Sequence, residues 1–98
     1  MATARATIAN KKGLHARAAA KVVKTASAFT ARIEITRLPR PGEEQDPTAK
    51  AGATSILSLL MLAAERGVDI QLDGDGADAE AAVAAIVALV DRKFDEEE

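Results

Sequence analysis

The sequence predicts a single α+β domain, in which helices cover one face of an antiparallel or mixed β-sheet. Segments with alternating apolar and polar residues are typical of half-buried strands, and segments with helical periodicity or composition separate them. In chain order the segments are β-α-β-β-α-β-α. The connections are too short for parallel crossovers unless a helix supplies the crossover, which favours antiparallel pairing.

Length and composition limit what such a domain does. A chain of 98 residues buries about 60–70% of the surface that its unfolded form exposes, enough for one thin core across residues 1–98. No apolar run approaches the roughly 18 residues of a membrane span, and the N-terminus has no signal-peptide pattern. The absence of cysteine excludes disulfides and thiolate metal sites. These features predict a cytoplasmic monomer that needs no metal, cofactor or membrane.

The first two elements are a strand and an alanine-rich helix. Residues 3–9 alternate, with small or apolar side chains at the even-numbered positions. Residues 10–13 end this pattern, and residues 16–28 contain many alanines but no Gly or Pro, which favours a helix. The basic residues of this helix share an outward face: Arg17, Lys21 and Lys24.

In the middle of the chain, the sequence predicts one strand before a long loop and a second, short strand near the end of that loop. Residues 29–37 alternate, with Ile33 and Ile35 directed inward. Residues 38–53 are punctuated by Pro and Gly, which indicates a loop. A short third strand is expected within residues 48–51.

The C-terminal half predicts a helix, a strand and a second helix. Ser55 precedes an apolar run and is the expected N-cap of a helix that continues to about Glu65 and ends at Gly67. Residues 68–73 alternate as a strand, and residues 77–94 form the last helix. The apolar face of that helix is formed by Ala79, Val83, Ile86, Val87, Val90 and Phe94.

Charge is distributed unevenly along the chain. Nine of the 13 Lys and Arg residues, but one of the 15 acidic residues, lie in residues 1–40. A basic half of this kind attracts anions or acidic partners. We interpret Asp95–Glu98 as an ordinary solvated and flexible tail. The acidic segment Asp73–Asp78 is predicted to be a turn, since position 12 of a calcium-binding loop would be Ala84.

His15, the only histidine, stands at the junction before the first helix. Free backbone N–H groups and the positive end of the helix dipole make such a junction an anion site. Arg17 is close enough for its planar fork to bind phosphate oxygens. From these residues alone, a histidine at this position is more often a cap or an ordinary surface residue. One histidine and no cysteine also leave no means of building a nucleophile–base–acid triad.

The segment Gly13–Ala20, GLHARAAA, closely resembles the active-site segment of the HPr family, the histidine-containing phosphocarriers of the bacterial phosphotransferase system. Residues 55–70 resemble that family's regulatory-serine segment, short helix and last strand, and residues 77–94 fit its C-terminal helix. The resemblance implies an open-faced β-sandwich of four antiparallel strands with three helices on one face. It also implies a carrier, not an enzyme, that takes a phosphoryl group from enzyme I and passes it to an enzyme IIA-type acceptor.

The resemblance assigns roles to individual residues. His15 would be phosphorylated on Nδ1, Arg17 would stabilise the phosphoryl group, and Ser55 falls where many members carry a serine modified by an HPr kinase/phosphorylase. The partner-docking surface would contain Leu14, Ala20, Lys24, Ile56, Leu57, Leu60 and Met61. Without the resemblance, Ser55 is simply an N-cap, and apolar residues on a helix are more often part of the core.

Two departures from the family pattern bear on the pathway and the fold. Many members have proline where Ala18 stands, and related phosphocarriers of nitrogen-type systems share the alanine. Both sugar uptake and nitrogen or carbon regulation therefore stay open as the process served. Residues 38–53 are longer and richer in proline than is usual, which leaves the register of the third strand open.

Two other classes of function compete with the carrier. A nucleic-acid-binding module that used the basic half would need aromatic residues on the sheet for stacking, and Phe29 and Phe94 are the only aromatic residues. A non-catalytic regulatory domain that bound a small molecule would need a pocket at a dimer interface, which no sequence pattern here indicates.

Overall fold

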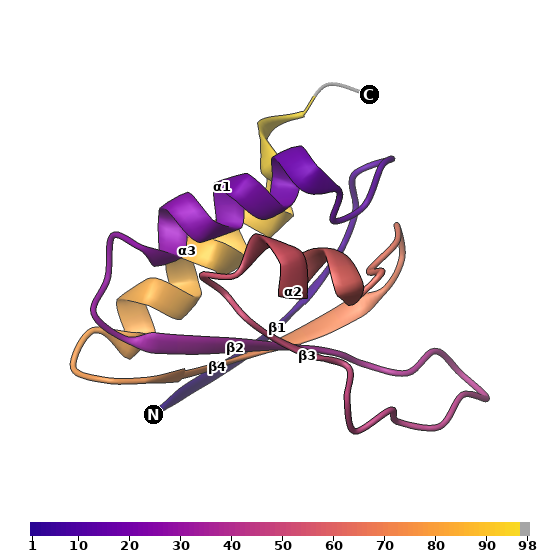
Figure 1. The fold of residues 1–98 in the computed structure, drawn as a ribbon, viewed down its shortest axis with the longest axis horizontal. Coiled ribbons are helices and arrows are strands. Elements are labelled where there is room, and N and C mark those ends of the chain that lie inside the picture. Colours follow the sequence, from indigo (N-terminus) through magenta and orange to yellow (C-terminus); the bar gives the residue numbers. More distant parts are fainter. Residues whose placement is uncertain (97–98) are drawn as a thin grey trace.

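A computed structural model describes residues 1–96. Four strands and three helices follow the predicted order β-α-β-β-α-β-α (Figure 1). The elements are β1 (Ala2–Thr7), α1 (Ala16–Ala26), β2 (Arg32–Arg37), β3 (Lys50–Gly52), α2 (Ile56–Met61), β4 (Asp69–Asp75), α3 (Ala79–Asp91) and the short turn η1 (Lys93–Asp95). None of the helices in residues 1–96 is long and apolar enough to cross a membrane.

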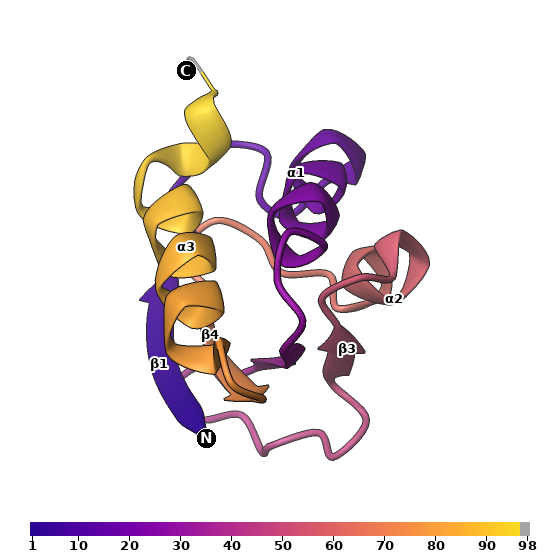
Figure 2. The ribbon, with the colours of Figure 1, turned by 90° about the vertical axis from the view of Figure 1, so that its left-hand side faces the viewer.

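The strands form one antiparallel sheet in the order β1-β4-β2-β3. The central strand β4 pairs Leu72 with Ala4 of β1 and with Ile35 of β2. All three helices lie on the same face of the sheet, and the opposite face carries no helix (Figures 1 and 2). The predicted α+β fold, an open-faced β-sandwich with three helices on one face, is confirmed.

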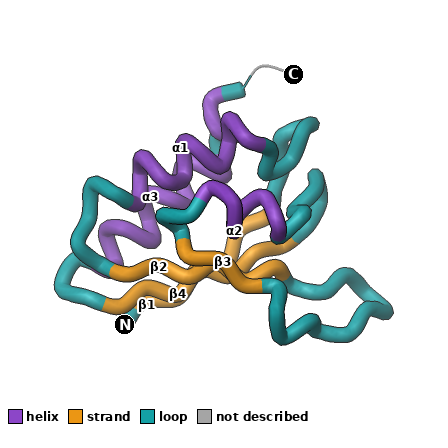
Figure 3. The backbone as a smooth tube through the Cα atoms, viewed as in Figure 1, coloured by secondary structure: helices purple, strands orange, loops and turns teal. Residues whose placement is uncertain are grey.

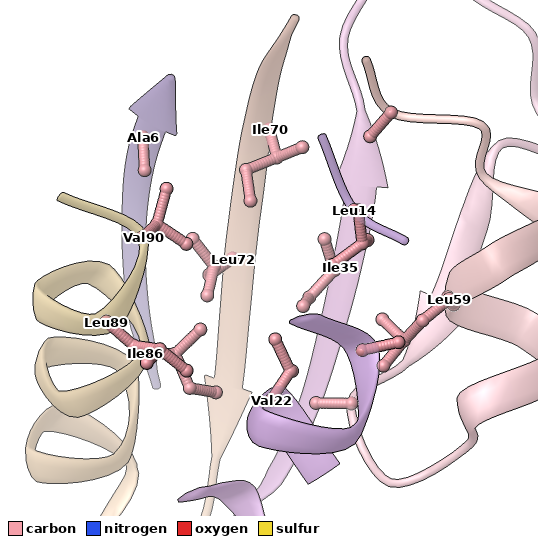
Figure 4. Packing of buried hydrophobic residues seen from close by; sticks show 14 of the residues in the cluster. Ala6, Leu14, Val22, Ile35, Leu59, Ile70, Leu72, Ile86, Leu89 and Val90 are labelled. Atoms are coloured by element: carbon pink, nitrogen blue, oxygen red, sulfur yellow. The ribbon is translucent and has the colours of Figure 1, made fainter. Parts of the chain in front are cut away.

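The core lies between the sheet and the helices. The alternating strand residues point their apolar side chains toward the helices, as for Ile35 of β2 and Ile70 and Leu72 of β4 (Figure 4). Val22 of α1 and Ile86 of α3 meet them from the other side. Burial of these side chains, at roughly 1.5–3 kcal/mol for each large one, is the main source of stability in a domain of this size.

The two C-terminal helices are shorter than the sequence predicts. Helix α2 ends at Met61, not near Glu65, because Ala63 adopts a left-handed backbone conformation with φ of 52° well before Gly67. Helix α3 ends at Asp91, and Phe94 of the predicted apolar face lies in η1 beyond it. In both cases apolar residues continue in the sequence past the point where the helix ends, which is why the sequence predicts helices that are too long.

The predicted loop after β2 is present, and the third strand, Lys50–Gly52, begins within the expected residues 48–51 and ends one residue beyond them (Figure 3). The loop projects from the end of the sheet, and its chain returns through the hydrogen bond from the Arg37 N–H to the Ala49 carbonyl at 2.9 Å. β3 then pairs Ala51 with Ile35 and leads into Ser55, the first residue before α2. The loop therefore returns the chain to the sheet edge at β3, shortly before α2 begins.

Candidate functional site

His15 is the N-cap residue of α1, as the sequence predicts for a residue at this junction. Its backbone is extended, with φ of −85° and ψ of −178°, and its carbonyl accepts the hydrogen bond of the Ala19 N–H at 2.8 Å. Its side chain makes no capping hydrogen bond to the helix. The imidazole is therefore not used in closing the helix end and is available for chemistry.

The segment before His15 is held by close backbone packing. Gly13 has φ of 66°, and a Cβ atom there would lie 2.7 Å from the carbonyl oxygen of Ala64, so the position needs glycine. The Leu14 N–H donates to the same carbonyl at 2.9 Å. The chain that follows α2 thereby fixes where α1 begins, and with it the position of His15.

Asn10 is a fully buried polar residue five positions before the histidine. Its Nδ2 donates to the Gly13 carbonyl at 2.7 Å and to Oε1 of Glu96 at 2.8 Å. Buried amides are retained where their hydrogen bonds hold a particular geometry. Asn10 joins the loop before His15 to the C-terminal segment.

Glu96 reaches the histidine ring from the other end of the chain. One of its carboxylate oxygens, Oε2, contacts Nε2 of His15, and the other accepts the bond from Asn10. The His15 side chain is 27% exposed, whereas the Glu96 side chain is only 12% exposed. The interpretation of Asp95–Glu98 as a solvated tail is wrong at Glu96, and residues 97 and 98 lie outside the described residues.

The Glu96 carboxyl group is ionised at neutral pH. Burial raises its pKa, but hydrogen bonds from Asn10 and His15 and the nearby charges of His15 and Lys21 outweigh burial and leave the pKa below its usual range. The site therefore places a carboxylate against one ring nitrogen of the histidine.

Arg17 lies two residues after His15 in the first turn of α1 and is exposed. Its side chain makes no hydrogen bond or ion pair with any other part of residues 1–96. Its guanidinium is therefore free to bind an anion held near His15, where the N-terminus of α1 contributes a partial positive charge. The first turn of α1 contains no acidic residue to oppose this.

A model of the family described as "PTS HPr component phosphorylation site" matches residues 2–92. The chain belongs to this family. It is 53% identical over 90 residues to the phosphocarrier protein NPr of Shewanella violacea, covering 92% of this chain and 89% of that protein. It is 37% identical over 92 residues to the phosphocarrier protein HPr of Pseudomonas aeruginosa, covering 94% and 93%. A crystal structure of HPr from Thermoanaerobacter tengcongensis superimposes with a TM-score of 0.82 at 36% identity and 100% coverage of both chains.

Membership of the HPr family supports a role as a phosphocarrier of the phosphotransferase system. Proteins of this kind carry a phosphoryl group rather than transform a substrate of their own.

The structure exposes six of the seven residues expected to dock partners and buries the seventh. Ile56, Leu57, Leu60 and Met61 are the large apolar residues that α2 exposes, with Leu57 and Met61 exposed by 69% and 76%. Ala20 and Lys24 are exposed on α1, which lies beside α2 (Figure 2). Leu14 differs: it is 6% exposed and belongs to the hydrophobic core, so its side chain is not available to a partner.

Ser55 is the N-cap of α2. Its Oγ accepts from the Ser58 N–H at 3.2 Å and donates to the Ser58 Oγ at 2.9 Å. The residue therefore has a structural task that accounts for a serine at this position. It also lies immediately before the exposed apolar residues of α2.

Sequence reasoning missed Asn10 and Glu96. Asn10 carried one available signal, since a polar residue that directly follows an alternating strand is often a side chain that organises the next turn. No sequence signal pointed to Glu96, because a glutamate in an acidic tail has the same neighbouring residues whether its side chain is solvated or bound to another residue.

Proposed function

We propose that this protein accepts a phosphoryl group on Nδ1 of His15 from phosphorylated enzyme I and passes it to an enzyme IIA-type acceptor. The observation that carries the proposal is the position of the only histidine at the N-terminus of α1, two residues before an exposed arginine without a partner among residues 1–96.

The chemistry at His15 requires a nucleophilic nitrogen and a place for negative charge. A neutral imidazole offers one nitrogen lone pair that attacks phosphorus. The phosphoryl oxygens then lie near the positive end of the α1 dipole, where anions are stabilised. Arg17 supplies two parallel donors for those oxygens, which a lysine cannot match.

Partner proteins dock on the surface formed by α1 and α2. Four large apolar side chains on one short helix form a patch of the kind that marks an interface, and basic residues of α1 lie beside it. Residues of the docking surface are Ala20, Lys24, Ile56, Leu57, Leu60 and Met61. Acidic partners would gain from the basic side of this surface through faster association.

We infer further that the protein serves the nitrogen-type branch of the system. The support is the 53% identity to the NPr protein of Shewanella violacea and the alanine at position 18. Transfer from the phosphorylated protein to purified nitrogen-type and sugar-type IIA acceptors tests this branch. A clear rate preference for sugar-type acceptors would reverse the assignment.

Phosphoenolpyruvate and enzyme I provide the test of the central proposal. Intact-mass measurement should show one phosphoryl group on the protein, lost in acid because a phosphoramidate hydrolyses there whereas a phosphoester does not. His15→Asn should stay unlabelled and folded. Arg17→Ala should fold but accept phosphate more slowly, Arg17→Lys should recover part of the rate, and the exposed Arg66→Ala should match the wild type. Acid-labile labelling of His15→Asn would refute the proposal.

A further inference from the structure

We propose that Glu96 is a positioning residue for phosphoryl acceptance: its carboxylate binds the Nε2–H of His15, orients the ring and leaves Nδ1 as the nitrogen with the free lone pair. The inference rests on the proposed function, because it concerns the nitrogen that takes the phosphoryl group. It adds a residue outside the matched range 2–92 to the working parts of the site.

The contact itself fixes the tautomer. A carboxylate only accepts hydrogen bonds, so the ring nitrogen that it contacts must carry the proton. A neutral imidazole has a single N–H, so Nδ1 is then unprotonated. The same logic governs histidines that are oriented by a carboxylate on one nitrogen while the other nitrogen does the chemistry.

Glu96 is itself held on both sides. Its second oxygen accepts from Asn10, a buried residue whose amide also fixes the Gly13 carbonyl two residues before His15. The carboxylate is mostly buried and ionised. One amide therefore aligns both the loop that carries the histidine and the carboxylate that orients its ring.

The backbone that delivers Glu96 is strained, which indicates that tertiary contacts select its position. Lys93, Phe94 and Asp95 have φ of 58°, 56° and 60°, three consecutive left-handed residues that are not glycine. Such a turn persists only where its surroundings over-determine it. Phe94 is fully buried, and its carbonyl accepts a hydrogen bond from Lys21 of α1. The turn η1 lies where the chain passes from α3 toward the start of α1 (Figure 1).

The transfer step balances with no other reactant. The Nδ1 lone pair attacks the phosphorus of the phosphorylated donor, an N–P bond forms at His15, and the bond from phosphorus to the donor atom breaks with its electron pair staying on the donor. His15 keeps its Nε2 proton, so positive charge develops on the ring during attack. The carboxylate of Glu96 lies against that N–H and opposes this charge. When the phosphoryl group leaves for the acceptor, the ring returns to the same tautomer.

Nitrogen NMR of the single histidine tests the positioning directly, because one imidazole gives one set of signals. At an alkaline pH where histidine side chains are neutral, the wild type should be almost entirely Nε2–H. Glu96→Ala should show a measurable Nδ1–H population, and Glu96→Gln, which keeps a neutral acceptor, should lie between them. Asp91→Asn, which removes an exposed carboxylate near the end of α3, is the matched charge control and should resemble the wild type.

Direct phosphorylation by phosphoramidate, a small donor that needs no docking, supplies the second readout. Mutation of the carboxylate that binds a metal-ligating histidine typically lowers metal affinity or activity by about 10–100-fold. Because His15 is partly exposed, we expect a smaller effect here: Glu96→Ala should be phosphorylated about three- to tenfold more slowly than the wild type. Glu96→Gln should lose less, and Asp91→Asn should lose nothing.

Unchanged tautomer populations and rates in Glu96→Ala, or faster phosphorylation, would overturn the positioning role; faster phosphorylation would make Glu96 an obstructing group. Failure of the proposed function looks different. In that case enzyme I and phosphoenolpyruvate leave the wild type unlabelled, whatever the tautomer of the ring.

Discussion

Single residues near His15 act through a few short hydrogen bonds. Gly13 allows the close approach of the loop to the Ala64 carbonyl, and Asn10 holds the Gly13 carbonyl. Neither residue needs to touch a phosphoryl group to affect the site. Their importance follows from geometry, since in the proposed transfer a displaced ring nitrogen would no longer lie at the reacting distance from the phosphorus of a docked donor.

Asn10 offers the sharpest test at the scale of a residue. Asn10→Ala removes two donated hydrogen bonds from a fully buried position, so the free energy of unfolding should fall by about 1–3 kcal/mol. Urea denaturation measures the loss. Gln45→Ala is the matched control, because it also removes an amide that donates twice, to Arg37 and Asp46, but at an exposed position. Its effect should stay within about 0.5 kcal/mol. Equal losses in the two variants would contradict the structural role of Asn10.

At the scale of elements, α2 combines two properties that are usually separate. Leu59 and Leu62 are buried and hold the helix on the core, while Ile56, Leu57, Leu60 and Met61 remain exposed. A helix of six residues cannot be stable alone, so its inward residues and its N-cap must support the exposed patch. The sequence-based alternative that Ile56, Leu57, Leu60 and Met61 belong to the core is wrong, because all four side chains are exposed.

Ser55 caps α2 immediately before the proposed docking surface, and we propose it as a regulatory phosphorylation site for an HPr kinase/phosphorylase. A phosphate there would add about −1.5 to −2 charge beside the apolar patch and would weaken docking by desolvation and by repulsion of acidic partners. Ser55→Asp should raise the apparent Michaelis constant for transfer from enzyme I with little change in maximal rate. Ser55→Ala should dock normally and lose about 1 kcal/mol of stability through the missing cap. A Ser55→Asp protein with an unchanged Michaelis constant would leave the serine as a cap alone.

At the scale of the whole molecule, Asp78 connects the segment that follows α1 to the start of α3. Its carboxylate accepts from the Thr30 N–H at 2.9 Å and from the Ala31 N–H at 2.8 Å, which ties the turn before α3 to the loop after α1. The backbone hydrogen bond from Thr30 is the largest of the effects that lower the pKa of Asp78; burial opposes it, and the bond from Ala31 assists it.

The lowered pKa makes part of the stability depend on pH with a definite sign. A carboxyl group with a folded-state pKa below its unfolded value stabilises the protein fully above the unfolded value, and the contribution is lost as the pH falls through the folded-state pKa. Asp78→Asn should therefore be less stable than the wild type at neutral pH, and the difference should shrink in acid. Thermal melting between neutral pH and about pH 3 measures this. Asp91→Asn, at an exposed position, should show no such convergence; a constant deficit for Asp78→Asn would contradict the linkage.

The local sequence determined much of this protein. Alternation of residues with period two located β1, β2 and β4, because a half-buried strand must place every second side chain in the core. The apolar face of residues 77–94 and the alanine-rich composition of residues 16–28 located two helices, each of which ends earlier in the structure. The junction of His15 and Arg17 with the first helix was also visible, since a helix N-terminus is a local feature. The fold class follows from these patterns and from the short connections between them.

The tertiary structure decided what no local pattern records. Glu96 contacts a residue 81 positions away, and that contact depends on where α3 ends and how the left-handed turn is held by Phe94 and Lys21. Leu14 is buried in the core, and its backbone N–H donates to the Ala64 carbonyl in the chain that follows α2. The local sequence around Glu96 and Leu14 is the same whether their side chains are exposed or buried. Packing against distant parts of the chain therefore decides which of the two occurs.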